Sequence, residues 1–382
     1  MSDALERDGL EALVATSAAN VAYVAGFSGL TEAGSTPRRL AIFTRRGTAL
    51  VIPTIEAPAA VIDEAEVDHV VCFGDFPAAI SESPGVSWRR LESALDHRAA
   101  SLPEALGLAL GLLGVRSGTI GVDESGLRHR EWERVNERLG HVKVVNGTDH
   151  LAAARRVKAP FEIECLQRAL GIAEEALNEV IQTLVRGTTE REAAAAYGAE
   201  TVKRGADPRR VLVSMGERTS LPLAWPTDRA LRPGELVRFD VGCVYRGYHA
   251  GVVRTGALGE PTREHDVHYG ALLAGVEAAI DGAVAGRSAG DVLRAAIDAV
   301  RAHGLARYQL DHVGHGIGLE ACESPALAPG DLTTLEAGEV LQIAVPFYEV
   351  GGVGFGVKET VLVAMTEARL LNRSARGLVT LD

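Results

Sequence analysis

The stretch from Leu236 to Leu258 reads Leu-Val-Arg-Phe-Asp-Val-Gly-Cys-Val-Tyr-Arg-Gly-Tyr-His-Ala-Gly-Val-Val-Arg-Thr-Gly-Ala-Leu. Its apolar runs predict a strand, a turn near residues 245–247 and a return strand. Asp240 lies inside the apolar run of the first strand. A buried carboxylate is costly unless it is paired or bound to something. What Asp240 faces is therefore the first question about function.

The length and composition indicate a globular protein of two domains. The chain has 382 residues, of which 47% are hydrophobic and 24% charged, so each of two domains can bury a core. The formal net charge is −12, and no lysine-rich run offsets it. Phosphate backbones would be repelled on average, so we expect no nucleic-acid partner.

The same features bear on the compartment. The first eight residues lack the basic and then apolar layout of a signal peptide, and the most apolar segment, residues 105–115, is too short to span a bilayer. Four separated cysteines without CxxC spacing read as reduced thiols: Cys72, Cys165, Cys243 and Cys322. We therefore expect a cytoplasmic protein with no membrane partner.

A change in composition at residues 152–160 marks the domain boundary, which divides the chain into residues 1–154 and 155–382. The first domain alternates strand and helix signals, as in an α/β unit, and its glycines form no phosphate-binding loop. In the second domain, Pro160 fits the first turn of a helix. Helices with antiparallel hairpins predict an α+β domain with helices on one face of a curved sheet. Its helices are expected at about 160–186, 188–203, 264–285 and 289–303.

Polar side chains interrupt four apolar runs of the second domain. Taken singly, a buried histidine or a Lys-Glu pair at a strand end is more often structural than functional. Strands that each contribute one inward polar group are, however, how binding sites are usually assembled. The four clusters are Asp240 with His249 and Arg254; Asp311, His312, His315 and Cys322; the strand that ends at Tyr348; and Lys358 with Glu359.

Several longer motifs of the second domain point to one family. They are Arg-Val-Lys-Ala-Pro-Phe-Glu-Ile-Glu-Cys-Leu at 156–166, Arg-Pro-Gly-Glu-Leu-Val-Arg-Phe-Asp-Val-Gly at 232–242, Gly-His-Gly-Ile-Gly-Leu-Glu at 314–320 and Leu-Glu-Ala-Gly-Glu-Val at 335–340. With them, residues 157–365 resemble the pita-bread metallopeptidases, which include Xaa-Pro aminopeptidase, prolidase and creatinase. The first domain looks like the smaller domain of these enzymes, and Ser-Ala-Ala-Asn-Val-Ala-Tyr-Val-Ala-Gly-Phe-Ser-Gly at 17–29 matches its start.

The resemblance implies an α/β N-terminal domain, an α+β pita-bread C-terminal domain and a homodimer. Active members of the family hold two divalent metals with two Asp, one His and two Glu. Carried over by position, Asp240 and His315 are kept, whereas the other three positions fall on Gly251, Ala344 and Lys358. None of these three can coordinate a hard cation. The resemblance with these departures therefore implies no metal and no cofactor.

The charge balance suggests what replaces the metals. The loss of three carboxylates leaves Asp240 and the ammonium of Lys358, and a matched buried pair can be tolerated. We predict that Lys358 is the counter-ion of Asp240, near His315. A register slip of one residue would instead turn Glu359 inward, where Asp240, His315 and Glu359 could ligate a single metal. Three further histidine positions of the family fall on Leu223, Asp311 and Cys322.

Three functions are compatible with this pattern. The main prediction is a metal-independent enzyme that cleaves a C–N bond of a small polar metabolite, with Asp240, His315 and Lys358 as catalytic residues. Creatinase is the metal-free precedent in the family, although its catalytic histidine falls here on Leu223. One alternative is a non-catalytic member that binds a peptide or small ligand. The other is an Xaa-Pro aminopeptidase with a reduced, single-metal site.

Further residues are predicted to contact the small-molecule substrate. Arg254 or His249 could anchor a substrate carboxylate. Cys322 is either a nucleophile with His312 or His315 as its base, or a buried thiol that fills the space of a histidine. The full predicted substrate-binding set is His249, Arg254, Asp311, Cys322, Tyr348 and Glu359.

Overall fold

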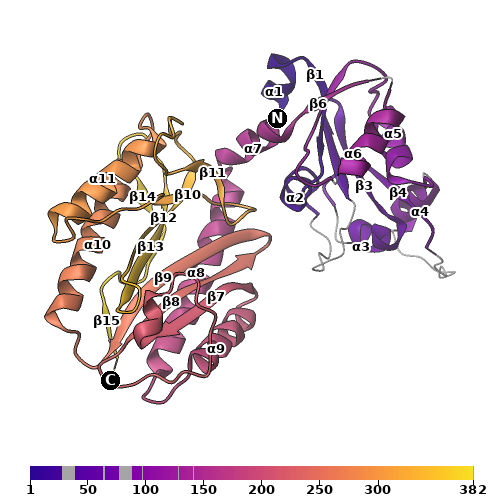
Figure 1. The fold of residues 1–382 in the computed structure, drawn as a ribbon. Helices are drawn as coiled ribbons and strands as arrows, with labels where there is room; N and C mark the ends of the chain where they lie inside the picture. The colour runs from indigo at the N-terminus through magenta and orange to yellow at the C-terminus, as the bar shows by residue number, and fades with distance from the viewer. Residues whose placement is uncertain are drawn as a thin grey trace. The chain divides into compact units, whose positions relative to one another are not determined.

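The structure, a computed structural model, describes residues 1–27, 39–62, 65–76, 88–96, 98–127, 129–140 and 142–381. The chain forms two compact units, Met1–Arg155 and Arg156–Asp382, which are coloured from indigo to yellow along the chain in Figure 1. The last two residues of the motif at 17–29, Ser28 and Gly29, lie outside the described residues.

The first unit is built on a mixed six-stranded sheet in the order β4-β3-β2-β1-β5-β6. The pairs β1–β5, β5–β6 and β3–β4 are parallel, whereas β1–β2 and β2–β3 are antiparallel. The strands are β1 (Leu10–Ala15), β2 (Leu40–Thr44), β3 (Gly47–Pro53), β4 (His69–Phe73), β5 (Thr119–Val122) and β6 (Lys143–Asn146).

Helices pack on both faces of this sheet, which confirms the predicted α/β unit. Helices α5 and α6 share a core with one face, while α2, α3 and α4 contribute to a second core on the other. Ser17 caps α2, because its side chain accepts from the N–H of Asn20. The helices are α1 (Ser2–Arg7), α2 (Ala18–Ala25), α3 (Ala57–Ile62), α4 (Trp88–Asp96), α5 (Leu102–Leu112), α6 (His129–Arg138) and α7 (Thr148–Arg156), with a 3-10 turn η1 (Thr54–Glu56).

The second unit holds a larger sheet whose main path runs β11-β10-β12-β13-β9-β8-β7, with β14 beside β13 and β15 beside β9. Every pair along this path is antiparallel. The strands are β7 (Asp207–Met215), β8 (Leu236–Tyr245), β9 (Tyr248–Leu258), β10 (Gly314–Gly316), β11 (Glu323–Ala326), β12 (Val340–Tyr348), β13 (Gly354–Leu362), β14 (Arg369–Leu370) and β15 (Val379–Leu381).

Four helices cover this sheet in two pairs. Helices α8 and α9 pack on β7, β8 and β9, and helices α10 and α11 share a core with β12 and β13 (Figure 1). Pro160 stands in the first turn of α8, as predicted, and the Glu162 side chain accepts from the N–H of Ala159. The helices are α8 (Pro160–Thr183), α9 (Glu190–Lys203), α10 (Arg263–Gly282) and α11 (Ala289–Ala302), with a 3-10 turn η2 (Gly216–Ser220).

The hairpin β8–β9 forms where the sequence predicts it. Arg246 and Gly247 both have positive φ, 51° and 85°, which is the two-residue turn that matches strand twist. Asp240 pairs with Val253 across the hairpin, and Val253 in turn pairs with Lys358 of β13. This register decides which side chains share a face with Asp240. None of the helices in the described ranges is long and apolar enough to cross a bilayer.

Candidate functional site

The face of the large sheet opposite the helices carries the polar residues around Asp240. Residues directly opposite each other in a sheet point to the same side, and neighbours along a strand alternate. The registers Asp240–Val253, Val253–Lys358 and Lys358–Ala344 therefore put Asp240 and Lys358 on one face. We call this the inner face. Gln342, Tyr348 and His315 share it, because Gln342 and Tyr348 alternate with Ala344, and His315 pairs with Gln342.

Asp240 lies between two cations. Lys358 Nζ donates to its Oδ1 at 2.9 Å, and Arg210 Nε donates to its Oδ2 at 2.9 Å. The predicted contact of Lys358 with Asp240 is thus present. Burial alone would raise the pKa of Asp240, but the charges and hydrogen bonds of Lys358 and Arg210 hold it below its usual range. Asp240 is therefore an ionised carboxylate with both oxygens occupied.

Arg210 is not among the site residues predicted from the sequence. Residues 207–210 read Asp-Pro-Arg-Arg, which favours a loop, yet β7 pairs with β8 through an irregularity between Arg209 and Leu212. Arg210 has a φ of 47°, a conformation uncommon outside glycine. A bulge of this kind re-aims side chains, and here it brings the guanidinium to Asp240. In the sequence, the signal for Arg210 is limited to two adjacent arginines that precede an apolar run, residues 211–213, which could form a strand of the sheet.

The side-chain amide of Gln342 lies against Gly251, the position at which the resemblance implies a second aspartate. A Cβ on Gly251 would lie 3.1 Å from Gln342 Nε2, and this nitrogen donates to the carbonyl of Gly251 at 3.3 Å. Gln342 is buried. The small residue at 251 therefore makes room for the amide, and a larger side chain there would have to displace the end of Gln342.

His315 is paired with Cys322. His315 Nδ1 lies 2.9 Å from the carbonyl oxygen of Gly316, so it carries the proton, and Nε2 is left to accept from the Cys322 thiol at 3.3 Å. Burial lowers the pKa of His315, and the nearby charges of Lys358 and Arg210 act in the same direction. Cys322 is exposed, so the prediction of a buried, space-filling thiol is wrong. The pair has the atoms of a nucleophile and its base.

Tyr348 and His249 also lie on the inner face. Arg238 stacks on the Tyr348 ring at 5.0 Å, and its Nη1 donates to the Tyr348 oxygen at 3.3 Å. The other donors of Arg238 serve the carbonyls of Thr219 and Leu221. His249 is opposite Val244 near the turn of the hairpin, and burial, followed by the charge of Arg209, lowers its pKa.

Three predicted substrate contacts are placed away from Asp240. Arg254 and Glu359 each follow an inner-face residue, Val253 or Lys358, so strand alternation turns them to the helix side. There Arg254 Nη2 pairs with Glu359 Oε1 at 2.8 Å, and Arg254 also donates to the carbonyls of Lys358 and Ala375. Asp311 is exposed and contacts the ring of its neighbour His312 at 3.0 Å. The register slip that would turn Glu359 inward does not occur.

The described residues do not fit a metal centre. Both oxygens of Asp240 are held by cations, and Gln342 occupies the space at Gly251. In the part of the chain that the structure describes, no three His, Cys, Asp or Glu side chains are grouped so as to hold a metal ion.

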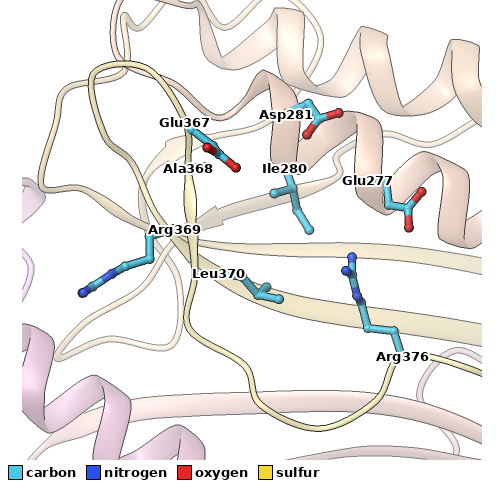
Figure 2. A pocket seen from close by; sticks show the side chains of 8 residues that line it. All are labelled: Glu277, Ile280, Asp281, Glu367, Ala368, Arg369, Leu370 and Arg376. Atoms are coloured by element: carbon cyan, nitrogen blue, oxygen red, sulfur yellow. The ribbon is translucent and has the colours of Figure 1, made fainter.

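A separate pocket lies on the helix side of the sheet. It has a volume of about 440 Å³ and is lined by Glu277, Asp281, Glu367, Arg369 and Arg376 among others. Figure 2 shows Arg376 extending toward Glu277 of α10, while Arg369 points away from both. None of the predicted site residues lines this pocket. The inner face around Asp240 is therefore the candidate site.

Comparison with known families identifies both units. The profile of metallopeptidase family M24 matches residues 164–367, and that of the creatinase/prolidase N-terminal domain matches residues 1–157. The Xaa-Pro dipeptidase of Pyrococcus furiosus is 28% identical over 265 residues, which are 68% of this chain and 75% of the relative. The probable dipeptidase PepE of Mycobacterium tuberculosis is 30% identical over 337 residues, 87% of this chain and 85% of the relative.

Solved structures agree on the fold. The X-Pro aminopeptidase from Thermotoga maritima superposes with a TM-score of 0.82 at 22% identity, covering 99% of this chain and 98% of the other. The prolidase from Pyrococcus furiosus gives a TM-score of 0.79 at 23% identity, covering 98% and 100%. The predicted combination of an α/β domain with a pita-bread domain is confirmed.

The comparisons correct the main prediction of function. That prediction was a metal-independent enzyme that acts on a small polar metabolite. The relatives and the solved neighbours bear the names of Xaa-Pro dipeptidases, prolidases and an X-Pro aminopeptidase, which contradicts it and favours the peptidase alternative. The prediction of a hydrolase family is confirmed.

Proposed function

This chain belongs to metallopeptidase family M24. We propose that it is a peptidase that recognises short peptides of the Xaa-Pro class. The observation that carries the proposal is the match to dipeptidases across both units, which reaches 85% of the length of the mycobacterial relative. A dipeptide is small enough to be bound by one face of one domain. We assign the inner face around Asp240 as its site.

The inner face supplies several kinds of polar contact to such a ligand. Arg210 and Lys358 offer cationic donors, and Tyr348 offers a phenolic oxygen that Arg238 holds in place. His315 and Cys322 form a thiol–imidazole pair at the same face. Since these residues come from β7, β8, β10, β12, β13 and the segment that precedes β11, the site depends on strands from both ends of the sheet.

A specific observation favours a second candidate, in which the protein binds the peptide without cleaving it. Three of the five metal-ligand positions implied by the resemblance hold Gly251, Ala344 and Lys358. The ammonium of Lys358 is 2.9 Å from Asp240 Oδ1, so a cation of the protein itself neutralises the carboxylate. Binding requires only this charge arrangement, whereas cleavage also requires a group that attacks the peptide carbonyl.

Two measurements on the full chain separate these candidates. Calorimetry with Ala-Pro, Leu-Pro and Gly-Gly tests recognition, and mass spectrometry of the same mixtures, with EDTA or with Mn²⁺, Co²⁺ or Zn²⁺, tests cleavage. Selective binding of the Xaa-Pro peptides with release of proline supports the peptidase. Selective binding with intact peptide after a day supports the binding protein. Failure of every peptide to bind would refute both.

We further propose that the protein works as a homodimer in the cytoplasm. The resemblance to the pita-bread enzymes motivates the dimer, and the four free thiols motivate a reducing compartment. Light scattering coupled to size-exclusion chromatography measures the mass in solution. A monomeric mass across the micromolar range would exclude the dimer.

A further inference from the structure

The cluster around Asp240 has more positive than negative charge. Two cations, Lys358 and Arg210, face the single carboxylate of Asp240, each at 2.9 Å. Arg238 of β8 adds a third cation, and it donates to neutral oxygens: the carbonyls of Thr219, Leu221 and Pro222 and the hydroxyl of Tyr348. A cluster with an excess of positive charge attracts anions and repels ammonium groups.

The two cations of the pair have donors to spare. Arg210 uses Nε for Asp240, and in the described ranges no protein group accepts from its two terminal nitrogens. Lys358 has three N–H donors, and the single acceptor found for them is Asp240 Oδ1. The Arg210 side chain is 54% exposed, against 10% for Lys358. A ligand therefore reaches the cluster from the Arg210 side.

The backbone is arranged to deliver Arg210 there. Its φ of 47° is an uncommon conformation for a side chain with a Cβ, and it occurs in the irregular stretch of β7. Such conformations cost free energy and persist where the surrounding structure enforces them, often at binding sites. The neighbouring Arg209 is also exposed, but its Nη1 donates to the carbonyl of Pro208. Of these two arginines, Arg210 is the one that pairs with Asp240.

We propose that Arg210 and Lys358 bind the free C-terminal carboxylate of a short peptide. The inference rests on the proposed function and specifies the orientation of its ligand. The guanidinium presents a planar fork of donors that matches a carboxylate, and the ammonium adds a point charge. The same positive charge opposes the N-terminal ammonium of the peptide, so the carboxylate end points toward Asp240 and the amino end away from it.

The test compares two forms of one peptide on three forms of the protein. Calorimetry measures binding of Ala-Pro and of Ala-Pro amide to the native protein, to Arg210→Met and to the matched control Arg209→Met. We expect the amide to bind about tenfold or more weakly than the acid to the native protein, because it lacks the charge-assisted contacts. Arg210→Met should lower the affinity for the acid by a similar factor and leave the affinity for the amide unchanged. Arg209→Met should behave as the native protein.

The outcomes separate this inference from the proposed function. Equal affinity of the native protein for acid and amide would overturn the carboxylate contact and leave peptide binding intact. A second readout, thermal unfolding with acetate or inorganic phosphate, needs no peptide. Stabilisation by acetate that Arg210→Met abolishes supports the site even if no peptide binds. Stabilisation by phosphate alone, or an unaltered response in Arg210→Met, would overturn it. In Arg210→Met, Lys358 still pairs with Asp240, so we expect this variant to fold.

Discussion

At the scale of single residues, Asp240 shows how one carboxylate can be kept while its surroundings change. Its pKa is held low by Lys358 and Arg210 against the effect of burial. Removing one partner of a buried pair leaves an uncompensated charge, whereas removing both can be nearly neutral. The pair is therefore open to a double-mutant cycle.

We expect Lys358→Met to lower the free energy of unfolding by about 3 kcal/mol, near the lower end for a broken buried pair because Arg210 still holds Oδ2. The combined Asp240→Asn and Lys358→Met variant should recover most of this loss. Urea denaturation followed by circular dichroism measures four proteins: the native protein, the single variants Lys358→Met and Asp240→Asn, and the double variant.

The matched control is the exposed ion pair of Arg191 and Asp228, whose atoms are 2.8 Å apart, against 2.9 Å for Lys358 and Asp240, but whose side chains are 64% and 82% exposed. Arg191→Met should leave stability unchanged, because exposed pairs are screened by solvent. If the single and the double variants at Lys358 and Asp240 are equally unstable, the two residues are not coupled and the account of the pair is wrong.

At the scale of elements, strand alternation explains why the contact of Lys358 with Asp240 was predicted correctly and why Arg254 and Glu359 were assigned to the site wrongly. The hairpin β8–β9 and strand β12 were predicted from their apolar runs, and the contact of Lys358 with Asp240 followed from the register of the motifs around them. Arg254 and Glu359 were assigned to the site although each is next to an inner-face residue. The alternation alone excludes them, once the partner of Asp240 is known to be Val253.

Arg210 could not be found in this way. Residues 207–210 are polar and include a proline, so local propensity disfavours a strand. The strand exists because β8 provides a partner edge and α9 covers β7. The position of the guanidinium depends on a bulge and on a positive φ, and neither is encoded in hydrophobic periodicity. Contacts that depend on irregular backbone need the tertiary structure.

Strands β9, β12 and β13 carry the three metal-ligand positions that the resemblance implies and that hold other residues here, and these positions allow a test. Restoring carboxylates with Gly251→Asp, Ala344→Glu and Lys358→Glu adds three oxygen ligands beside Asp240 and His315 on one face. The Gln342 amide nitrogen, 3.1 Å from a Cβ at position 251, is the end of a side chain and can move aside. We expect the triple variant to retain about one equivalent of Mn²⁺ or Zn²⁺ after desalting, and the native protein far less.

The isosteric amide variant, Gly251→Asn with Ala344→Gln and Lys358→Gln, controls for volume without adding charge. Plasma mass spectrometry measures the metal content of each protein. One tightly bound equivalent in the native protein would contradict the prediction that Lys358 replaces the metals as the counter-ion of Asp240.

At the scale of the whole molecule, the two units have separate hydrophobic cores, and the candidate site lies entirely in the second. The helix side of that unit holds ionisable groups that the site does not use. Glu359 is fully buried there against Arg254, and its carboxylate also lies near Glu174 of α8, which accepts from the backbone N–H groups of residues 373 and 374. Through Arg254 and Glu174, the Glu359 carboxyl is connected with the sheet, helix α8 and the C-terminal segment.

The pH dependence of global stability follows from this buried carboxyl. Burial raises the pKa of Glu359 to about 7, although Arg254 and Arg376 oppose the shift. The folded state therefore holds its proton more tightly than the unfolded state, whose pKa is near 4.5. The stabilisation from Glu359 is complete below pH 4.5 and is lost as the pH rises through 7. Because a tenfold difference in proton affinity is about 1.4 kcal/mol, the loss is about 3 kcal/mol.

We expect Glu359→Gln to remove this dependence, because the amide does not titrate. Urea denaturation between pH 5 and pH 8 should show the native protein losing more stability than the variant as the pH rises, with the exposed Glu260→Gln as the surface control. Glu339, whose pKa burial also raises to about 7, leaves a residual slope of the same sign in Glu359→Gln. Parallel curves for the native protein and Glu359→Gln would mean that Glu359 is already ionised at pH 5, so that its pairing with Arg254 outweighs its burial.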